Sequence, residues 1–304
     1  MIIILITQVL TMFLLAAIGM VMFKSDKITL SGSKSLANIL LYLALPSVII
    51  QGFLVERDEP HVQMLLLSVV AAVAMMVVSI LVSRLLFAKD PTAHFASAFA
   101  NPGFFGIPVI TAILSPSAVF FVAHLVAILN LFQWTYGVGL WKKEKSSFLA
   151  IGKRLLSAPF MIAILLGLFF FFTGFEMHEL MHKCITFLAG LNTPLAMFAV
   201  GVYMAQTNLK AMFTKPILYK VSFARLLLIP LISLGILSLF PSSMSQMKLA
   251  FLIAAACPTG SNIAMYAQLY DQDYPYAVET VVISTLFCIV TMPLVILLAQ
   301  SIWI

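Results

Sequence analysis

The feature that most constrains this chain is a series of long apolar runs, separated by short loops that carry charge, proline or glycine. A bilayer core is about 30 Å thick, and a helix needs about 20 apolar residues to cross it. The chain is 62% hydrophobic and 9% charged, which is too little charge for a surface that faces water. We therefore expect an all-α integral membrane protein with ten transmembrane helices, at residues 2–23, 35–55, 62–87, 93–114, 117–141, 155–175, 182–206, 216–240, 247–270 and 275–302.

Lysine and arginine are divided unevenly among the loops. Cytoplasmic loops accumulate these residues, so the alternation predicts a multi-pass protein of the cell (inner) membrane with both termini outside the cytoplasm. The formal charge of +6 therefore indicates topology, and we expect no nucleic-acid partner. The odd-numbered loops hold Lys24, Lys27, Lys34, Arg84, Lys89, Lys142, Lys143, Lys145, Lys153, Arg154, Lys210, Lys215 and Lys220, whereas the even-numbered loops hold only Arg57, Lys183 and Lys248.

The two halves of the chain carry weakly similar motifs at corresponding positions. The second predicted helix reads LYLALPSVIIQGF around Pro46, and the seventh reads LAGLNTPLAMFAVGV around Pro194. The fourth carries ANPGFFGIPV and the ninth carries AACPTGSNIA. Two copies with an odd number of helices insert in opposite orientations. We therefore expect two inverted five-helix repeats, at residues 1–150 and 151–304.

The fourth and ninth predicted helices are interrupted near their middles. NPGFFGIP at 101–108 and CPTGSN at 257–262 combine proline, which removes a backbone donor, with glycine, which weakens a helix. Unpaired backbone groups cost several kcal/mol each in hydrocarbon, so such breaks persist where they line a cavity. Corresponding interruptions in both halves are typical of a transporter binding site.

These breaks also predict the charge of the ligand. The second half-helices should begin near residues 104 and 262, with their positive N-terminal ends in one region, which favours an anion. Neutral side-chain donors beside both breaks can hold a carboxylate. The alternative is that the prolines only kink the helices for packing, but matched positions in both halves favour a site. The predicted substrate-binding residues are Asn101, Pro102, Gly103, Gly106, Pro108, Pro258, Thr259, Gly260, Ser261 and Asn262.

Five further polar residues lie inside the predicted helices. Gln51 and Asn192 are added to the substrate-binding set because they flank the prolines of the second and seventh helices. His124, Arg225 and Glu279 are candidates for coupling or for contact with substrate charge. A structural hydrogen bond for the histidine and snorkelling for the arginine are the alternatives. Only one of the eleven acidic residues enters a predicted helix, which argues against a cation/proton antiporter with midplane carboxylates.

Four stretches of the chain resemble the auxin efflux carrier family, which includes bacterial malate and malonate permeases and plant auxin exporters. They are LYLALPSVI at 41–49, NPGFFGIPV at 101–109, TPLAMFAVG at 193–201 and VVISTLFCIVTMPLVIL at 281–297. Length, helix number and the order of these pieces agree with the family, so the resemblance covers the whole chain.

The resemblance implies a fold similar to the bile-acid sodium symporters, in which broken helices 4 and 9 cross. It implies a panel or scaffold domain of helices 1, 2, 6 and 7, and a transport domain of helices 3–5 and 8–10. It also implies that Asn101, Pro108, Pro258 and Asn262 are site residues.

We therefore expect a secondary active transporter of small organic anions, such as malate- or malonate-like carboxylates or auxin-like acids, that works by alternating access. A sodium-coupled carrier of bulkier amphipathic, bile-acid-like anions is the closest alternative. A membrane-embedded enzyme or a sensor fits less well, because the sequence has no intramembrane catalytic motif and no soluble domain. We expect no cofactor and no metal site, with H⁺ or Na⁺ open as coupling ion. The expected partners are the bilayer and the anion, and a homodimer is left open.

Overall fold

The computed structural model describes residues 2–54, 59–114, 118–141, 152–153 and 156–303, with the backbone alone described at 2 and 59–64. Among these residues the secondary structure is helical apart from one isolated β-bridge. The all-α prediction is thereby confirmed. Several basic residues used to predict the orientation lie outside the described residues: Arg57, Lys142, Lys143, Lys145 and Arg154.

Seven of the described helices are long and apolar enough to cross a membrane, which makes this a multi-pass membrane protein. The predicted helices at 93–114 and 247–270 are missing from this set because each is interrupted. The predicted helix at 155–175 corresponds to the shorter α9 (Pro159–Thr173). The arrangement of ten helices in inverted repeats stays a prediction. The seven are Ile3–Lys24, Leu30–Phe53, Leu65–Phe87, Val119–Gly137, Glu179–Gln206, Pro216–Ser238 and Tyr274–Trp303.

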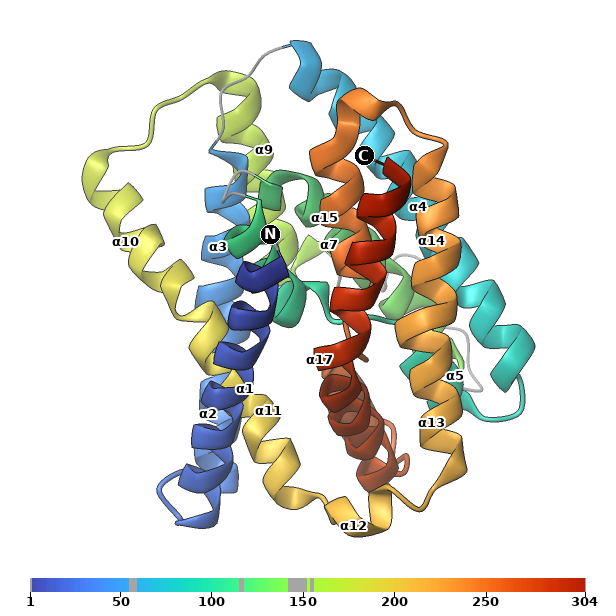
Figure 1. Ribbon diagram of the computed structural model, residues 1–304. Helices are drawn as coiled ribbons and strands as arrows, with labels where there is room; N and C mark the ends of the chain where they lie inside the picture. Colours follow the sequence, from blue (N-terminus) through green and yellow to red (C-terminus); the bar gives the residue numbers. More distant parts are fainter. Residues whose placement is uncertain (1, 55–58, 115–117, 142–151, 154–155, 304) are drawn as a thin grey trace.

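One group of helices occupies the left part of Figure 1, where α1 packs along α11 and α3 packs against α9 and α10. The π-helical turn η1 joins α2 to α3 without ending the helix. The bounds are α1 Ile2–Lys24, α2 Leu30–Ile39, η1 Leu40–Ala44, α3 Leu45–Phe53, α10 Glu179–Gly190 and α11 Asn192–Gln206.

Small residues allow α1 and α11 to approach closely. A Cβ atom on Gly19 would lie 2.7 Å from the Cα of Phe198, and one on Gly201 would collide with the carbonyl oxygen of Ala16. In a membrane, where lipid is as apolar as the side chains, such close backbone packing is a main source of helix association.

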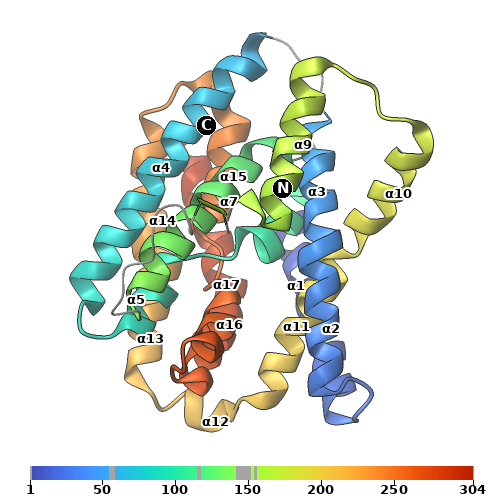
Figure 2. The same cartoon turned by 180° about the vertical axis from the view of Figure 1, so that it is seen from behind.

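A second group occupies the right part of Figure 1, where α4 packs against α5, α7 and α14, and α17 packs against α13 and α16. Figure 2 shows this group from behind, with α4 and α7 toward the viewer. The short α12 (Leu209–Met212) leads into it from α11. The bounds are α4 Glu59–Phe87, α5 Pro91–Ala98, η2 Pro102–Gly106, α6 Ile107–Ile113, α7 Val119–Phe132, η4 Gln133–Gly137, α13 Pro216–Phe223, η5 Ala224–Leu228, α14 Ile229–Ser238, η6 Ser242–Met244, α15 Ser245–Ala255, α16 Asn262–Leu269 and α17 Tyr274–Trp303.

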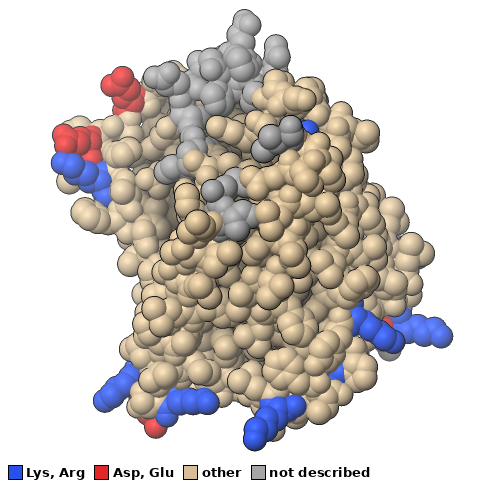
Figure 3. Space-filling model, viewed as in Figure 1, with Lys and Arg blue, Asp and Glu red and all other residues tan. Residues whose placement is uncertain are grey.

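On the face drawn in Figure 3, charged side chains lie toward the ends of the molecule. In Figure 3 lysine and arginine atoms gather along the lower rim, the end at which the α1–α2 turn and α12 lie, below a broad belt without charge. This distribution is what the loop charges predict for the cytoplasmic side. The orientation itself stays a prediction.

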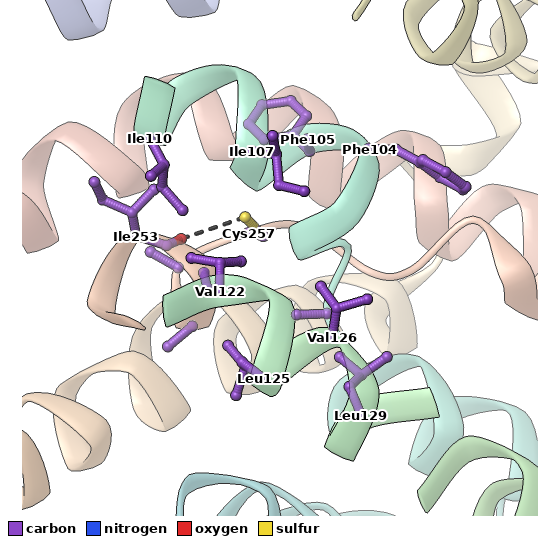
Figure 4. Packing of buried hydrophobic residues seen from close by; sticks show 14 of the residues in the cluster. Phe104, Phe105, Ile107, Ile110, Val122, Leu125, Val126, Leu129, Ile253 and Cys257 are labelled. Atoms are coloured by element: carbon purple, nitrogen blue, oxygen red, sulfur yellow. Dashed lines mark hydrogen bonds between the residues drawn. The ribbon is translucent and has the colours of Figure 1, made fainter. Parts of the chain in front are cut away.

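The first interrupted helix is held by apolar packing on both of its neighbours. Figure 4 shows Ile107 and Ile110 of α6 beside Val122 of α7 and Ile253 of α15. All four side chains are buried. The Cys257 thiol donates a hydrogen bond to the carbonyl of Ile253 at 3.3 Å, so the second break begins directly against this cluster.

Candidate functional site

The two helix interruptions lie side by side and satisfy each other's backbone. The Asn101 N–H donates to the carbonyl of Pro258 at 2.9 Å, and the Gly260 N–H donates to the carbonyl of Phe99 at 2.9 Å. This pair of hydrogen bonds surrounds the isolated antiparallel β-bridge. Because the breaks release backbone groups far from water, mutual pairing removes most of the cost of unwinding.

Local sequence explains where the first break falls. Proline disfavours helical geometry in the residue before it, so Pro102 prevents Asn101 from continuing α5. The side-chain oxygen of Asn101 then accepts from the Phe104 N–H at 3.4 Å and caps the new helical segment η2. Asparagine is among the preferred N-cap residues. The interruption therefore ends one half-helix and starts the next within three residues.

The second break depends on a threonine and a glycine. The Thr259 hydroxyl donates to the carbonyl of Ala96 at 2.9 Å, and its N–H donates to the Ser284 hydroxyl of α17 at 3.0 Å. A Cβ atom on Gly260 would lie 2.9 Å from the carbonyl oxygen of Ala100. Only glycine fits where the two segments approach this closely.

The Arg225 side chain lies on the side of the two interruptions where α5 and α15 end. Its side chain, 2% exposed, donates through Nη1 to the carbonyls of Ser97 at 3.1 Å and Ala98 at 3.2 Å and to the Ser79 hydroxyl at 3.3 Å. Nη2 donates to the carbonyl of Ala255 at 2.5 Å. The C-terminal ends of helices carry partial negative charge, so one guanidinium group balances both half-helices.

The opposite side, where η2 and α16 begin, opens into a cavity of about 360 Å³. Its walls are α2 and α11 on one side and η2, α16 and the start of α17 on the other. Lys34 is the one cation among its described lining residues, which include no Asp or Glu. The cavity is therefore electropositive, and its other polar lining residues are Ser33, Asn38, Tyr203, Gln206, Ser261, Asn262, Gln268 and Tyr274.

A smaller cavity of about 50 Å³ lies next to the larger one. Leu41, Phe104 and Asn262 line both cavities. Beyond them the small cavity reaches the helix starts themselves. Its lining includes Asn101, Pro102, Gly103, Asn130 and Gly260. The two cavities together thus border both the lysine on α2 and the N-terminal ends of the second half-helices.

Buried amides beside the helix starts have unused hydrogen-bonding capacity. The Asn262 amide donates to the side-chain oxygen of Gln133 at 3.2 Å, and the Asn192 amide donates to the carbonyl of Gly103 at 3.3 Å. The Gln133 amide nitrogen and the Asn192 side-chain oxygen have no hydrogen-bond partner among the described residues. Buried polar atoms are normally paired, so this region can accept a polar ligand.

Three further residues of the predicted set, Gly106, Pro108 and Gln51, are absent from the described lining of both cavities. Gly106 faces the Cys257 thiol, 2.9 Å from where a Cβ would stand, and Pro108 is buried in α6. Gln51 lies in the last turn of α3 and is not among the described residues that line either cavity. Their role in binding stays a prediction.

The candidates for coupling lie away from both cavities. His124 is buried against the rings of Phe53 and Phe120, with centroids 5.4 and 5.2 Å away, and its Nδ1 lies 3.5 Å from the Ser68 hydroxyl. Glu279 accepts two hydrogen bonds from the Lys215 ammonium at 2.7 and 2.6 Å.

Sequence reasoning missed the α2 and α11 walls of the cavity. Lys34 was counted only as a topology charge, yet Lys34, Asn38 and Leu41 recur at the spacing of one helix face. Tyr203 and Gln206 share a face of α11 in the same way. Polar residues in register on a membrane helix are the signal that could have identified them.

A multi-pass helical protein with paired helix breaks beside an electropositive cavity falls in the class of membrane transporters rather than enzymes. The family model described as "Membrane transport protein" matches residues 4–296. The chain belongs to this family, which is the auxin efflux carrier family that its motifs indicate. It is also 26% identical over 281 residues to a Rhizobium meliloti (strain 1021) protein named "Putative malonate transporter", an alignment that covers 88% of this chain and 87% of the relative.

Proposed function

We propose that this protein is a secondary active transporter of small organic anions and that the 360 Å³ cavity is the path to its binding site. The observation that carries the proposal is the charge pattern of that cavity. It has one cation and no acidic residue among its described lining, and it leads to the N-terminal ends of η2 and α16. Helix N-terminal ends and neutral amides bind anions without a buried counter-charge.

The proposed substrates are short carboxylates of the malonate or malate type. Small-molecule sites commonly occupy about 300–1,000 Å³, and the cavity lies near the lower end of this range. A cavity of this size has room for a short carboxylate. The name of the Rhizobium relative supports the same choice.

Alternating access is the proposed mechanism. The cavity walls come from two groups of helices, α2 and α11 on one side and η2, α16 and α17 on the other. Movement of one group against the other as a rigid body would close the cavity at one end and open it at the other. In this proposal the ten helices form inverted repeats, and the mutually hydrogen-bonded breaks move as one unit. The charge pattern predicts that the basic loops face the cytoplasm. In that orientation the mouth of the cavity lies on the cytoplasmic side.

The test is uptake of radiolabelled malonate and malate into proteoliposomes with imposed proton or sodium gradients. Native protein should accumulate at least one acid, and Asn101→Ala should lose most of this uptake. Asn208→Ala is the matched control, because Asn208 caps the exposed helix α12 in the same way and lines neither cavity. No uptake of either acid by native protein would reject the substrate class, and equal uptake by native protein and Asn101→Ala would remove Asn101 from the site.

A further inference from the structure

Arg225 is a buried cation whose recorded partners among the described residues are backbone carbonyls and one hydroxyl. The described ion pairs are Lys183–Glu179 and Lys215–Glu279, so no described carboxylate neutralises it. An uncompensated charge in such a place would cost several kcal/mol. Its compensation must come from the oxygen atoms that surround it.

The surrounding oxygens belong to two half-helix ends. Each helix C-terminus carries about half a negative elementary charge, and α5 and α15 end on the same guanidinium group. Two such ends sum to about one negative charge, which a single cation balances. In secondary carriers, half-helix C-terminal ends and unwound carbonyls are also where sodium is held.

We propose that Arg225 is a built-in cation that occupies the place between the two half-helix C-terminal ends where a carrier could otherwise bind sodium. It is a positioning residue, because it joins α5 of the first half to α15 of the second and is absent from the described lining of the 360 Å³ cavity. The inference rests on the proposed transport function. It predicts that anion transport does not need sodium at this position.

The guanidinium group also borders a space of about 30 Å³. Arg225 and Ser233 both line this space, and neither the Nε atom of Arg225 nor the Ser233 hydroxyl has a hydrogen-bond partner among the described residues. The space is large enough for a water molecule. The other donors of the arginine are occupied by the helix ends and by the Ser79 hydroxyl.

The experiment replaces the cation and then returns it from solution. Arg225→Ala should lower the maximal rate of anion uptake roughly tenfold or more while the KM stays within about twofold, because the cavity lining is unchanged. Guanidinium ion should restore part of that rate, whereas urea, which has the same planar shape without charge, should not. Arg225→Lys should retain more of the rate than Arg225→Ala. Arg84→Ala, which removes an exposed arginine at the end of α4, is the matched control and should behave as native.

Native uptake should also be unchanged when sodium is replaced by choline at constant pH and membrane potential. A sodium requirement in the native protein, or equal rescue by urea and guanidinium, would overturn the inference. Thermal unfolding in detergent keeps the test independent of transport, because guanidinium should raise the Tm of Arg225→Ala more than urea does. If native protein takes up no anion while this Tm difference is present, the proposed function fails and the built-in cation stands.

Discussion

Partial charges of helix ends converge on both sides of the paired helix breaks, and the protein treats the two sides differently. On the side where α5 and α15 end, partial negative charges converge and the buried side chain of Arg225 neutralises them. On the side where η2 and α16 begin, partial positive charges converge beside an open cavity of about 360 Å³ and a second cavity of about 50 Å³. Arg225 is the counter-ion of the helix C-terminal ends, whereas the helix N-terminal ends have no charged side chain of the described residues beside them in the smaller cavity and can bind an anionic ligand.

This difference teaches how to recognise an anion site that contains no strong cation. An aspartate or glutamate at the helix starts would have neutralised them and left nothing for a ligand to do. The chain instead places neutral amides there, Asn101, Asn262 and Gln133, of which Gln133 has a spare donor. Helix ends that the protein itself leaves unbalanced are therefore the stronger indication of function.

The largest effect is expected from a variant that pushes the two helix interruptions apart, because both sides of the comparison depend on their pairing. Gly260→Ala places a Cβ 2.9 Å from the carbonyl oxygen of Ala100, so the segments must move apart and their hydrogen bonds weaken. We expect loss of uptake together with a lower Tm. Gly235→Ala in α14 is the control, because nothing lies within 4 Å of its Cβ position. Native-like uptake by Gly260→Ala would show that the close pairing is not required.

A negative charge at the helix starts is expected to have the next largest effect. Asn101→Asp keeps an oxygen that can accept from the Phe104 N–H, so the cap survives, but it repels an anion. Uptake should fall roughly tenfold or more with little change in Tm. A variant with normal uptake would mean that Asn101 acts only as a cap.

Lys34 should have a moderate effect that depends on ionic strength. Lys34→Gln removes the cation from the described cavity lining, and we expect the KM for malonate to rise about three- to tenfold at low salt and less at high salt. Lys27→Gln is the matched control, because it removes the same charge from the α1–α2 turn and Lys27 is not among the described lining residues. Equal KM values for the two variants would reject a local role for Lys34.

The smallest effect is expected at Glu279. Its side chain is 10% accessible and is paired with Lys215, which is 44% accessible, and neither residue is among the described lining of the two cavities. Glu279→Gln should therefore change uptake less than about twofold and leave its pH profile unchanged. A shifted pH profile would instead assign proton coupling to Glu279.

Local chemistry explains what could be predicted from the sequence. Proline and glycine occur close together at both interruptions, so the breaks at 99–101 and 256–261 follow from their own residues, whereas the isolated Pro293 lies within the continuous α17. The all-α membrane class follows in the same way from the length of the apolar runs.

What could not be predicted depends on contacts between distant segments. A role of Arg225 in coupling or substrate contact stays a prediction, but its partners in the structure are carbonyls 127, 128 and 30 residues away, which no local pattern indicates. Lys34 enters the cavity lining because α2 packs beside α11, which no local pattern specifies. Packing between distant segments therefore decides that Arg225 fills one side of the helix breaks and that a cavity adjoins the other.

The central claim is that anions reach the helix starts through this cavity, and a blocked cavity tests it most directly. Gln268 lines the cavity and is exposed, whereas the neighbouring Leu269 is exposed but absent from the described lining. Both positions are changed to cysteine in a Cys184→Ser background, because Cys184 is the exposed native cysteine among the described residues. A charged, membrane-impermeant thiol reagent should stop malonate uptake by Gln268→Cys, malonate should slow that labelling, and Leu269→Cys should be unaffected. Full labelling of Gln268→Cys with undiminished uptake would contradict the claim.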